Sequence, residues 1–235
     1  MKATTRRRQD SSSGYQCGDE SSARLLAVAL ERFGEQGFEG ASTRDIAERA
    51  GLNAPALNYY FRNKHGLYLA CVEYMTQRVS EALSPAIEQA EATVAGGADR
   101  ETLIEAFCAL HRSIAQLMLR SPETAGWRKF YAREQAGLGP GDGEQQMHAV
   151  VGQRLLAVTC TLVARLRGQT EVDQASTLRA ITLHGQLLPF HLTPGVTLAA
   201  LGWQDFAGER FEQVIEMVCE QTRTLLLGIA PLSIN

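Results

Sequence analysis

A short stretch near the N-terminus carries amide, phenol, guanidinium and ammonium groups at the spacing of one helix and its flanks. Asn58 and Tyr59 follow each other on a short helical pattern, on the face opposite Leu57. Their side chains are polar and long enough to reach base edges or phosphates. Arg44 stands at the start of the preceding helical pattern, and Lys64 follows the next turn. Because helix N-termini and basic groups are natural phosphate contacts, this stretch is a candidate polyanion-binding surface.

The elements that position these groups are two short helices joined by a tight turn. The first is expected to start at Thr43, whose hydroxyl can cap it, and to end at Gly51. The second is expected after Asn53 as its cap, with Pro55 in the first turn, and runs to about Tyr60. Two short helices joined by a turn with a glycine match a helix-turn-helix, although any tight helical corner has this pattern. The polar side chains on the second helix favour DNA binding.

Charge is distributed unevenly along the 235 residues, whose net charge is −3. Residues 1–64 carry 10 Lys and Arg against 8 Asp and Glu, giving +2, whereas residues 65–235 carry 13 against 18, giving −5. An electropositive end on an acidic body is typical of a polyanion-binding module joined to a different domain. Residues 1–20 lack apolar periodicity and are expected to form a disordered basic arm. Its Arg6, Arg7 and Arg8 could enter a minor groove or lie in a solvated tail.

Beyond residue 20, apolar residues recur at helical spacing and period-two alternation is hard to find. The sequence therefore predicts an all-α fold of about nine helices. After a first helix from Ser21 that Gly34 and Gly37 close, the expected helices cover residues 43–50, 54–60, 64–90, 101–120, 122–135, 144–167, 171–191 and 203–227. Pro85 is expected to kink the fourth helix or end its regular part. The expected loops are VAGGADR, AGLGPGDG and LTPGVTLAALG, at residues 94–100, 136–143 and 192–202.

The five cysteines, Cys17, Cys71, Cys108, Cys160 and Cys219, occur singly and without metal-site spacing. Four lie in apolar helical patterns, where a free thiol behaves as a small buried hydrophobe, and a redox sensor is the alternative. No apolar run reaches the roughly 18 residues that a membrane span needs. The basic N-terminus has no apolar segment behind it, unlike a secretory signal. A cytoplasmic protein is expected.

Residues 21–68 resemble the DNA-binding domain of TetR-family transcriptional regulators. The resemblance rests on a Phe-x-x-x-Gly lead-in, a Thr before Ile-Ala, an Ala-Gly turn and a Tyr-Phe-x-x-Lys-x-x-Leu ending, carried by Phe33, Gly37, Thr43, Ile46, Ala47, Tyr60, Phe61, Lys64 and Leu67. Within the family, LYLAC after the motif and KFYAREQ at Lys129–Gln135 resemble the CecR/YbiH-like subgroup.

The resemblance implies a helix-turn-helix DNA-binding domain over residues 21–67 and a larger helical ligand-binding and dimerisation domain over residues 68–235. It assigns DNA contacts to Thr43, Arg44, Asn53, Ala54, Ala56, Asn58, Tyr59, Tyr60 and Lys64. Thr43 and Arg44 would meet phosphates or the groove edge, Asn58 and Tyr59 would read bases, and Tyr60 and Lys64 would hold the DNA backbone. At Ala54 and Pro55 many members have a basic or small polar residue followed by glycine. Ala54 or Ala56 would instead touch a thymine methyl group, so the operator stays open.

The resemblance further implies a homodimer through the last two long helices and a small-molecule effector that releases operator DNA from a repressor. The apolar residues expected at the dimer contact are Ala180, Leu183, Leu187, Leu188, Phe211, Val214, Val218 and Leu225, with ordinary core as the alternative. The effector pocket is expected among the middle helices. Its candidate lining is Phe107, His111, Met118, Trp127, Phe130, Tyr131 and Met147, each of which could also be core.

An enzyme is the rival class, and the sequence argues against it. There is no Gly-rich phosphate loop, no G-x-S-x-G and no H-E-x-x-H, so neither catalytic residues nor a cofactor are predicted. His184 and His191 could bind a metal, but no third ligand stands at metal spacing. A helical ligand carrier or enzyme without DNA binding stays open as the alternative. The sequence does not identify the effector, the target genes or the direction of regulation.

Overall fold

The computed structural model describes residues 12–120, 124–141 and 152–229, and within them the chain is helical and has no strand. The all-α prediction is confirmed. The helices are α1 (Ser12–Gly40), α2 (Thr43–Arg49), α3 (Ala54–Phe61), α4 (Lys64–Ala95), α5 (Arg100–Ala115), a π-helical turn (Gln116–Arg120), α6 (Thr124–Gln135), α8 (Gln153–Leu166), α9 (Gln174–His184), a 3-10 turn (Gly185–Leu187), α10 (Leu188–Leu192), α11 (Pro194–Leu201) and α12 (Glu209–Leu227). None of the described helices is long and apolar enough to cross a membrane.

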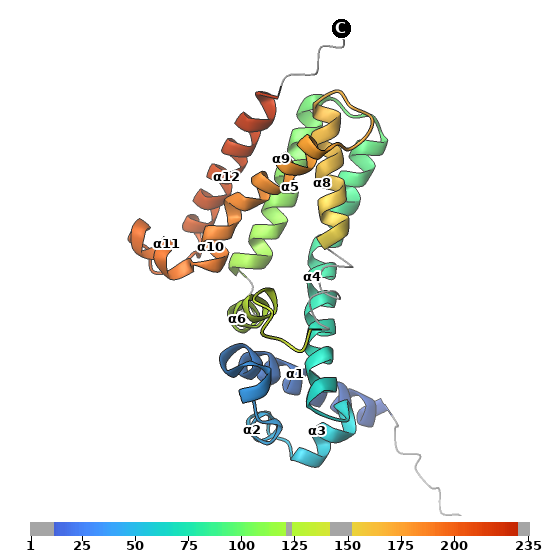
Figure 1. Cartoon of the computed structure of the whole chain (residues 1–235), viewed down its shortest axis with the longest axis vertical. Helices are drawn as coiled ribbons and strands as arrows, with labels where there is room; N and C mark the ends of the chain where they lie inside the picture. The colour runs from blue at the N-terminus through green and yellow to red at the C-terminus, as the bar shows by residue number, and fades with distance from the viewer. Residues whose placement is uncertain (1–11, 121–123, 142–151, 230–235) are drawn as a thin grey trace, which may run out of the picture.

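The molecule has two apolar cores that α4 connects. Helices α1, α2 and α3 lie at one end, α5, α8, α9 and α12 lie at the other, and α4 runs from the first group into the second (Figure 1). One core joins α1–α3 to the first half of α4 and to α6, and the other joins the second half of α4 to the C-terminal helices. Helix α6 therefore belongs with the N-terminal helices in packing, although it follows α5 in sequence.

Helix α1 differs from the prediction at both ends. It begins at Ser12, so the expected disordered arm is wrong for residues 12–20, while Arg6, Arg7 and Arg8 lie outside the described residues. Gly34 does not end the helix, because its missing side chain serves packing: a Cβ there would lie 2.9 Å from the carbonyl oxygen of Gly126 on α6. The helical geometry breaks at Gly37, whose φ of 76° is open to glycine at little cost.

Helix α4 is longer than expected. It has 32 residues, passes through Pro85 and ends at Ala95 rather than near Ala90. Its first turn is capped by Asn63, whose Oδ1 accepts the amide of Gly66 at 2.7 Å. The helix therefore links the two ends of the molecule without a break at the proline.

The C-terminal third has more breaks than the sequence predicted. The expected helix over 171–191 divides after His184, because Pro189 has no amide to continue the hydrogen-bond ladder. The expected loop at 192–202 contains α11, which starts at Pro194 and ends on the left-handed Gly202. Helix α12 starts at Glu209 rather than Trp203, after Gly208 with φ 56° and ψ −130°.

Candidate nucleic-acid interface

Helices α2 and α3 form a two-helix corner whose ends are capped by side chains. Ser42, rather than Thr43, caps α2: its hydroxyl accepts the amide of Asp45 at 3.4 Å. Asn53 caps α3 as predicted, with its Oδ1 accepting the amide of Ala56 at 2.9 Å. Between the helices, Gly51 takes a φ of 72° that allows the tight turn. The corner is thus a helix-turn-helix.

Helix α3 has one buried and one solvent-facing side. Leu57 is buried in the N-terminal core, whereas Asn58 and Ala54 are exposed. Tyr59 is 83% exposed, and its ring meets only the neighbouring Tyr60 at a centroid distance of 5.4 Å among the ring contacts of the described residues. A large aromatic side chain so exposed on a monomer surface is unusual unless it meets a partner. The predicted base-reading pair therefore projects from the corner.

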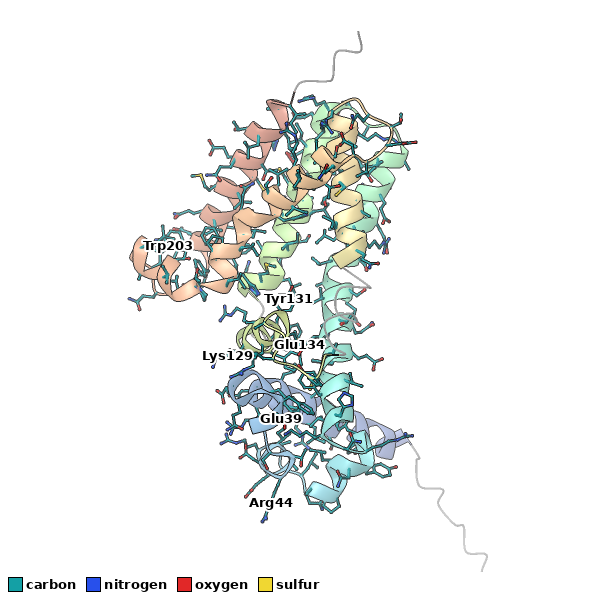
Figure 2. The ribbon with its side chains drawn as sticks, in the orientation of Figure 1. Glu39, Arg44, Lys129, Tyr131, Glu134 and Trp203 are labelled. Atoms are coloured by element: carbon teal, nitrogen blue, oxygen red, sulfur yellow. The ribbon has the colours of Figure 1, made fainter. Side chains whose placement is uncertain are left out.

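The predicted phosphate contacts surround α3. Arg44 is exposed on α2 and points away from the body of the molecule (Figure 2). Thr43 is half-buried in the first turn of the same helix. Lys64 has a role that the sequence did not reveal, because its ammonium donates to the carbonyl of Glu39 at 3.0 Å and lies 4.9 Å from the centre of the Phe38 ring. Lys64 thus also fixes the end of α1 to the start of α4.

Arg62 is a candidate contact that the sequence reasoning missed. It is exposed directly after α3, with φ 65° and ψ −48°, and the amide of Asn63 donates to the carbonyl of Phe61 at 2.7 Å across it. This is the γ-turn geometry that is rare and strained for residues other than glycine. Strained residues cluster at functional sites, which makes Arg62 a candidate contact. The signal in the sequence was a basic residue between Phe61 and Lys64 of the motif.

Helix α6 is fixed onto α1 and α4 by side-chain hydrogen bonds. The guanidinium of Arg133 donates from Nε to the carbonyl of Gly34 at 2.9 Å and from Nη2 to that of Glu35 at 3.0 Å. On the other side, the Tyr68 hydroxyl donates to the carboxylate of Glu134, which is 3% exposed. Burial and that hydrogen bond raise the pKa of Tyr68. The phenol therefore stays protonated and can act as the donor at neutral pH.

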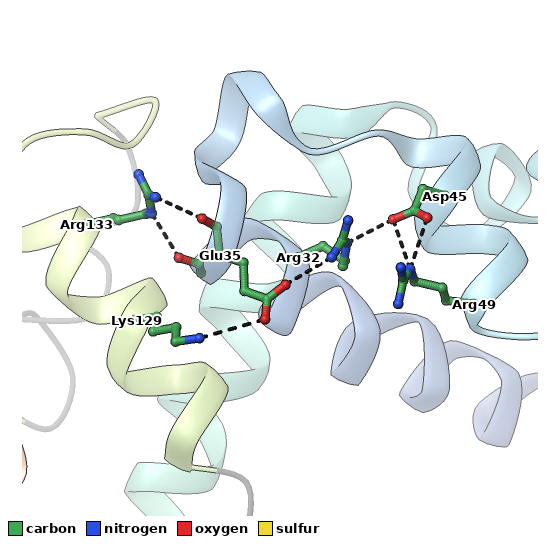
Figure 3. Close-up of polar contacts among 7 residues, drawn as sticks. Arg32, Glu35, Asp45, Arg49, Lys129 and Arg133 are labelled. Carbon is green, nitrogen blue, oxygen red and sulfur yellow. Dashed lines mark hydrogen bonds and ion pairs between the residues drawn. The ribbon is translucent and has the colours of Figure 1, made fainter. Parts of the chain in front are cut away.

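A row of ion pairs continues from α6 to the helix-turn-helix (Figure 3). Lys129 lies 3.7 Å from the Glu35 carboxylate, which pairs with Arg32 at 2.9 Å. Arg32 also pairs with Asp45 of α2 at 2.8 Å, and Asp45 pairs with Arg49 at 3.0 Å. The hydrogen bond from Arg49 is the main cause that lowers the pKa of Asp45. Because water screens exposed ion pairs, the row orients α6 and α2 more than it stabilises them.

The predicted pocket residues do not come together. Trp127 and Phe130 lie in the N-terminal core with Tyr131 packed against it, whereas Phe107 and His111 lie in the C-terminal core. Met118 packs against the C-terminal core as well, and Met147 lies outside the described residues. The sequence could not separate these sets, because the packing of α6 on α1 is a long-range contact.

A hollow of about 630 Å³ lies where α1 and α6 meet the end of α10 and the start of α11. It is lined by Ala27, Leu30, Glu31, Glu35, Tyr74, Gly126, Trp127, Arg128, Lys129, Ala132, His191, Leu192 and Pro194. Of the predicted pocket residues that the structure describes, only Trp127 lines it. His191, which the sequence paired with His184 as a weak metal candidate, is one of its walls, and no group of three His, Cys, Asp or Glu among the described residues could hold a metal ion.

The C-terminal core contains a buried polar cluster around His111. Its Nδ1 lies 3.1 Å from the Thr222 hydroxyl, which also accepts the Gln186 amide at 3.2 Å. His111 Nε2 and Gln186 Oε1 are buried and have no hydrogen-bond partner among the described residues. Buried polar atoms without partners are costly unless another molecule satisfies them.

Comparison with known proteins assigns this architecture. Residues 25–71 match the model of bacterial regulatory proteins of the tetR family, and residues 103–229 match the C-terminal domain of the HTH-type transcriptional dual regulator CecR. The CecR protein of Shigella flexneri is 32% identical over 218 residues, which are 92% of this chain and 96% of that protein. The chain belongs to the TetR family of transcriptional regulators. This confirms the family resemblance, including its CecR-like subgroup, and a regulator rather than an enzyme.

Solved TetR-like structures share the fold. AibR in complex with isovaleryl coenzyme A and operator DNA superposes with a TM-score of 0.60 at 17% identity, over 86% of this chain and 97% of AibR. A transcriptional regulator from Pseudomonas aeruginosa PAO1 also superposes with a TM-score of 0.60, at 21% identity, over 88% of this chain and 90% of that one. The N-terminal corner and the C-terminal bundle therefore correspond to the two parts of a TetR-family regulator.

Proposed function

We propose that this TetR-family protein is a cytoplasmic, homodimeric repressor that binds operator DNA through α3 and releases it when a small molecule binds the C-terminal bundle. The observation that carries the proposal is the outer face of α3, where Tyr59 is 83% exposed beside the exposed Asn58. Both can hydrogen-bond to base edges from a helix lying in the major groove. Asn53, Ala54, Ala56 and Tyr60 would complete the contact from the same helix and its cap.

Arg44 with Thr43, Lys64 and Arg62 would hold the DNA backbone on either side of α3. Arg44 and Arg62 are exposed, and Lys64 uses one of its three donors on Glu39. Contacts to phosphates fix register and orientation without reading sequence. The base-reading and the gripping residues are therefore separable by mutation.

A dimer is supported by the exposed apolar side chains of the C-terminal helices. Apart from Tyr59, Leu138 and Val172, every exposed large apolar residue of the described part lies on α9–α12: Leu178, Ile181, Leu188, Leu192, Val196, Leu201, Met217, Leu225 and Leu227. Most residues predicted for the dimer contact are buried inside the monomer instead: Ala180, Leu183, Leu187, Phe211, Val214 and Val218. Leu188 and Leu225 are the predicted positions that are exposed.

The effector would bind near His111, where the buried His111 Nε2 and Gln186 Oε1 have no partner among the described residues. These groups suit the polar end of a small molecule whose apolar part packs in the bundle. AibR, a structural relative, is held in complex with isovaleryl coenzyme A and operator DNA, which supports a small-molecule site in this fold beside the DNA-binding one. Release would follow if the effector favours a different α4 position, since both domains share that helix.

The test is an anisotropy titration of the full-length protein with the intergenic DNA beside its own gene, at two salt concentrations. Tyr59→Ala should lose preference for the operator over random DNA, whereas Lys64→Ala should weaken binding to both and reduce the salt dependence. Arg165→Ala is the matched control, because it removes an exposed cation from α8 at the other end of the molecule. Wild-type binding no tighter than to random DNA, with no site recovered by unbiased selection, would refute the proposal.

A separate reporter assay tests the direction of regulation. CecR of Shigella flexneri carries the name of a dual regulator, so a reporter fused to the bound promoter should be measured with and without the protein. Lower expression with the protein supports a repressor. Higher expression would contradict the proposed repression, but it would not contradict the proposed DNA binding.

A further inference from the structure

Two cysteines face each other where α5 packs on α12. The Cys108 sulfur lies 3.7 Å from the carbonyl oxygen of Cys219, and the Cys219 sulfur lies 3.8 Å from the carbonyl oxygen of Cys108. Each thiol thus reaches the backbone of the other residue, which requires the two side chains to lie against each other. The other buried cysteines have different neighbours, since Cys71 donates to the Leu26 carbonyl and Cys160 bonds to Thr177.

The surroundings make the two thiols unequal. The hydrogen bond with the Cys108 thiol lowers the pKa of Cys219, with help from Arg112 and Arg223 and against burial and Glu105. The same hydrogen bond, followed by burial, raises the pKa of Cys108. Cys219 is also the more accessible residue, at 8% exposed against 1% for Cys108. Because the thiolate is the reactive form of cysteine, Cys219 is the nucleophile of the pair.

We propose that Cys108 and Cys219 form a reversible dithiol–disulfide site on which hydrogen peroxide acts as the oxidant. The Cys219 thiolate attacks the peroxide, so an S–O bond forms, the O–O bond breaks, and hydroxide leaves as water after taking a proton. The Cys108 sulfur then attacks the Cys219 sulfenic acid. An S–S bond forms, the S–O bond breaks, and the leaving hydroxide takes the Cys108 proton to become water. Two thiols lose two electrons, and one peroxide becomes two water molecules.

The disulfide would fix α12 onto α5. The bonded residues are 111 positions apart, so the link closes a long loop and restricts the unfolded chain. The oxidised protein should therefore unfold at a higher temperature, and a small dithiol should reverse the shift. The inference does not rest on the proposed function, and neither of its readouts involves DNA.

The experiment treats the full-length protein with hydrogen peroxide, blocks the remaining thiols with an alkylating reagent and maps the peptides without reduction. The expected result is a peptide pair linked through Cys108 and Cys219 that dithiothreitol separates. Cys71→Ala and Cys160→Ala are matched controls that should keep the link. In Cys108→Ala, a sulfenic acid at Cys219 should persist and be trapped by dimedone, whereas Cys219→Ala should leave Cys108 unmodified.

Three results would overturn the site. They are alkylation of both cysteines after peroxide treatment, a disulfide that joins either of them to Cys17, Cys71 or Cys160 in place of the expected pair, or a melting temperature that oxidation lowers. The wild-type peptide map decides the question even if a cysteine variant fails to fold.

Discussion

Arg62 has a strained backbone conformation and lies directly after α3. It is the central residue of a γ-turn between the recognition helix and α4, and its side chain is exposed. The turn places the carbonyl oxygen of Phe61 where a Cβ on Gly66 would be 2.2 Å away, so Gly66 is part of the same arrangement. A strained arginine beside the DNA-facing helix is explained if the guanidinium contacts a phosphate.

Replacing Arg62 by glycine should separate strain from binding. Arg62→Gly should raise the free energy of unfolding by about 1 kcal/mol, because glycine accepts a positive φ without steric cost, while lowering affinity for all DNA sequences. Denaturant titration and anisotropy measure the two effects. Arg62→Ala is the control, since it removes the charge but keeps the strain. If Arg62→Gly bound DNA as tightly as the wild type, the phosphate contact would be excluded.

Arg100 ties the ends of three helices together. From the first turn of α5, its guanidinium donates to the carbonyl of Leu166 at 3.0 Å and to those of Leu226, Leu227 and Ile229 at 2.7, 2.9 and 2.7 Å. These carbonyls lie at the C-terminal ends of α8 and α12, which intrahelical amides leave unsatisfied. One side chain thus joins the C-terminal ends of α8 and α12 to the start of α5.

Truncation of Arg100 should destabilise the bundle without touching the DNA-binding corner. Arg100→Ala should lower the free energy of unfolding by about 2–4 kcal/mol, because several charged hydrogen bonds are lost and carbonyls lose partners. Arg100→Lys should recover part of the lost free energy of unfolding. An ammonium also donates hydrogen bonds, but from one nitrogen rather than from the separate nitrogens of a guanidinium. Thermal unfolding followed by circular dichroism is the measurement. Equal stability of Arg100→Ala and wild type would contradict the capping role.

The imidazoles of α5 and α9 make the stability of the same bundle depend on pH. Burial lowers the pKa of His111 to about 3, with a further effect of His184, and lowers the pKa of His184 to about 4. At a pH between these lowered pKa values and the ordinary imidazole pKa of 6.5, the two histidines bind protons in the unfolded chain but not in the folded chain. Stability is therefore complete above about pH 6.5 and falls as the pH drops toward 4.

The pH effect should be a few kcal/mol, since one pKa unit corresponds to about 1.4 kcal/mol. Urea titrations from pH 7 to pH 4 measure it. His111→Phe, which keeps an aromatic ring against Phe107 and His184, should flatten the profile relative to wild type. A wild-type profile that is level over this range would show that the imidazoles titrate normally.

Formation of the proposed dimer should depend on the exposed apolar side chains of α9–α12. Met217 and Leu225 lie on α12 and are 52% and 58% exposed, and charges there would have to be buried in a dimer. Met217→Glu/Leu225→Glu should therefore give monomers in sedimentation velocity and lose high-affinity operator binding, which needs two half-sites about 34–36 Å apart. Leu138→Glu, an exposed leucine outside these helices, is the control. A double variant that stays dimeric would place the interface elsewhere.

The sequence alone determined the helix-turn-helix, because its signals are local. Asn53 before Pro55, the glycine at 51 and the apolar Leu57 among polar neighbours act within one turn of helix, and each is found where it was predicted. The same holds for the all-α class, which follows from helical periodicity. The predicted cap of α2 was wrong because two neighbouring residues, Ser42 and Thr43, can each cap a helix, and Ser42 does so.

Only the tertiary structure decided which residues meet across the chain. Phe130 of α6 packs with the N-terminal core and Phe107 of α5 with the C-terminal core, although both belong to aromatic helical patterns in the middle of the sequence. Cys108 and Cys219 read as isolated buried thiols until α5 and α12 placed them together. Periodicity specifies which face of a helix is apolar, but the partner of that face depends on long-range packing, which no local pattern encodes.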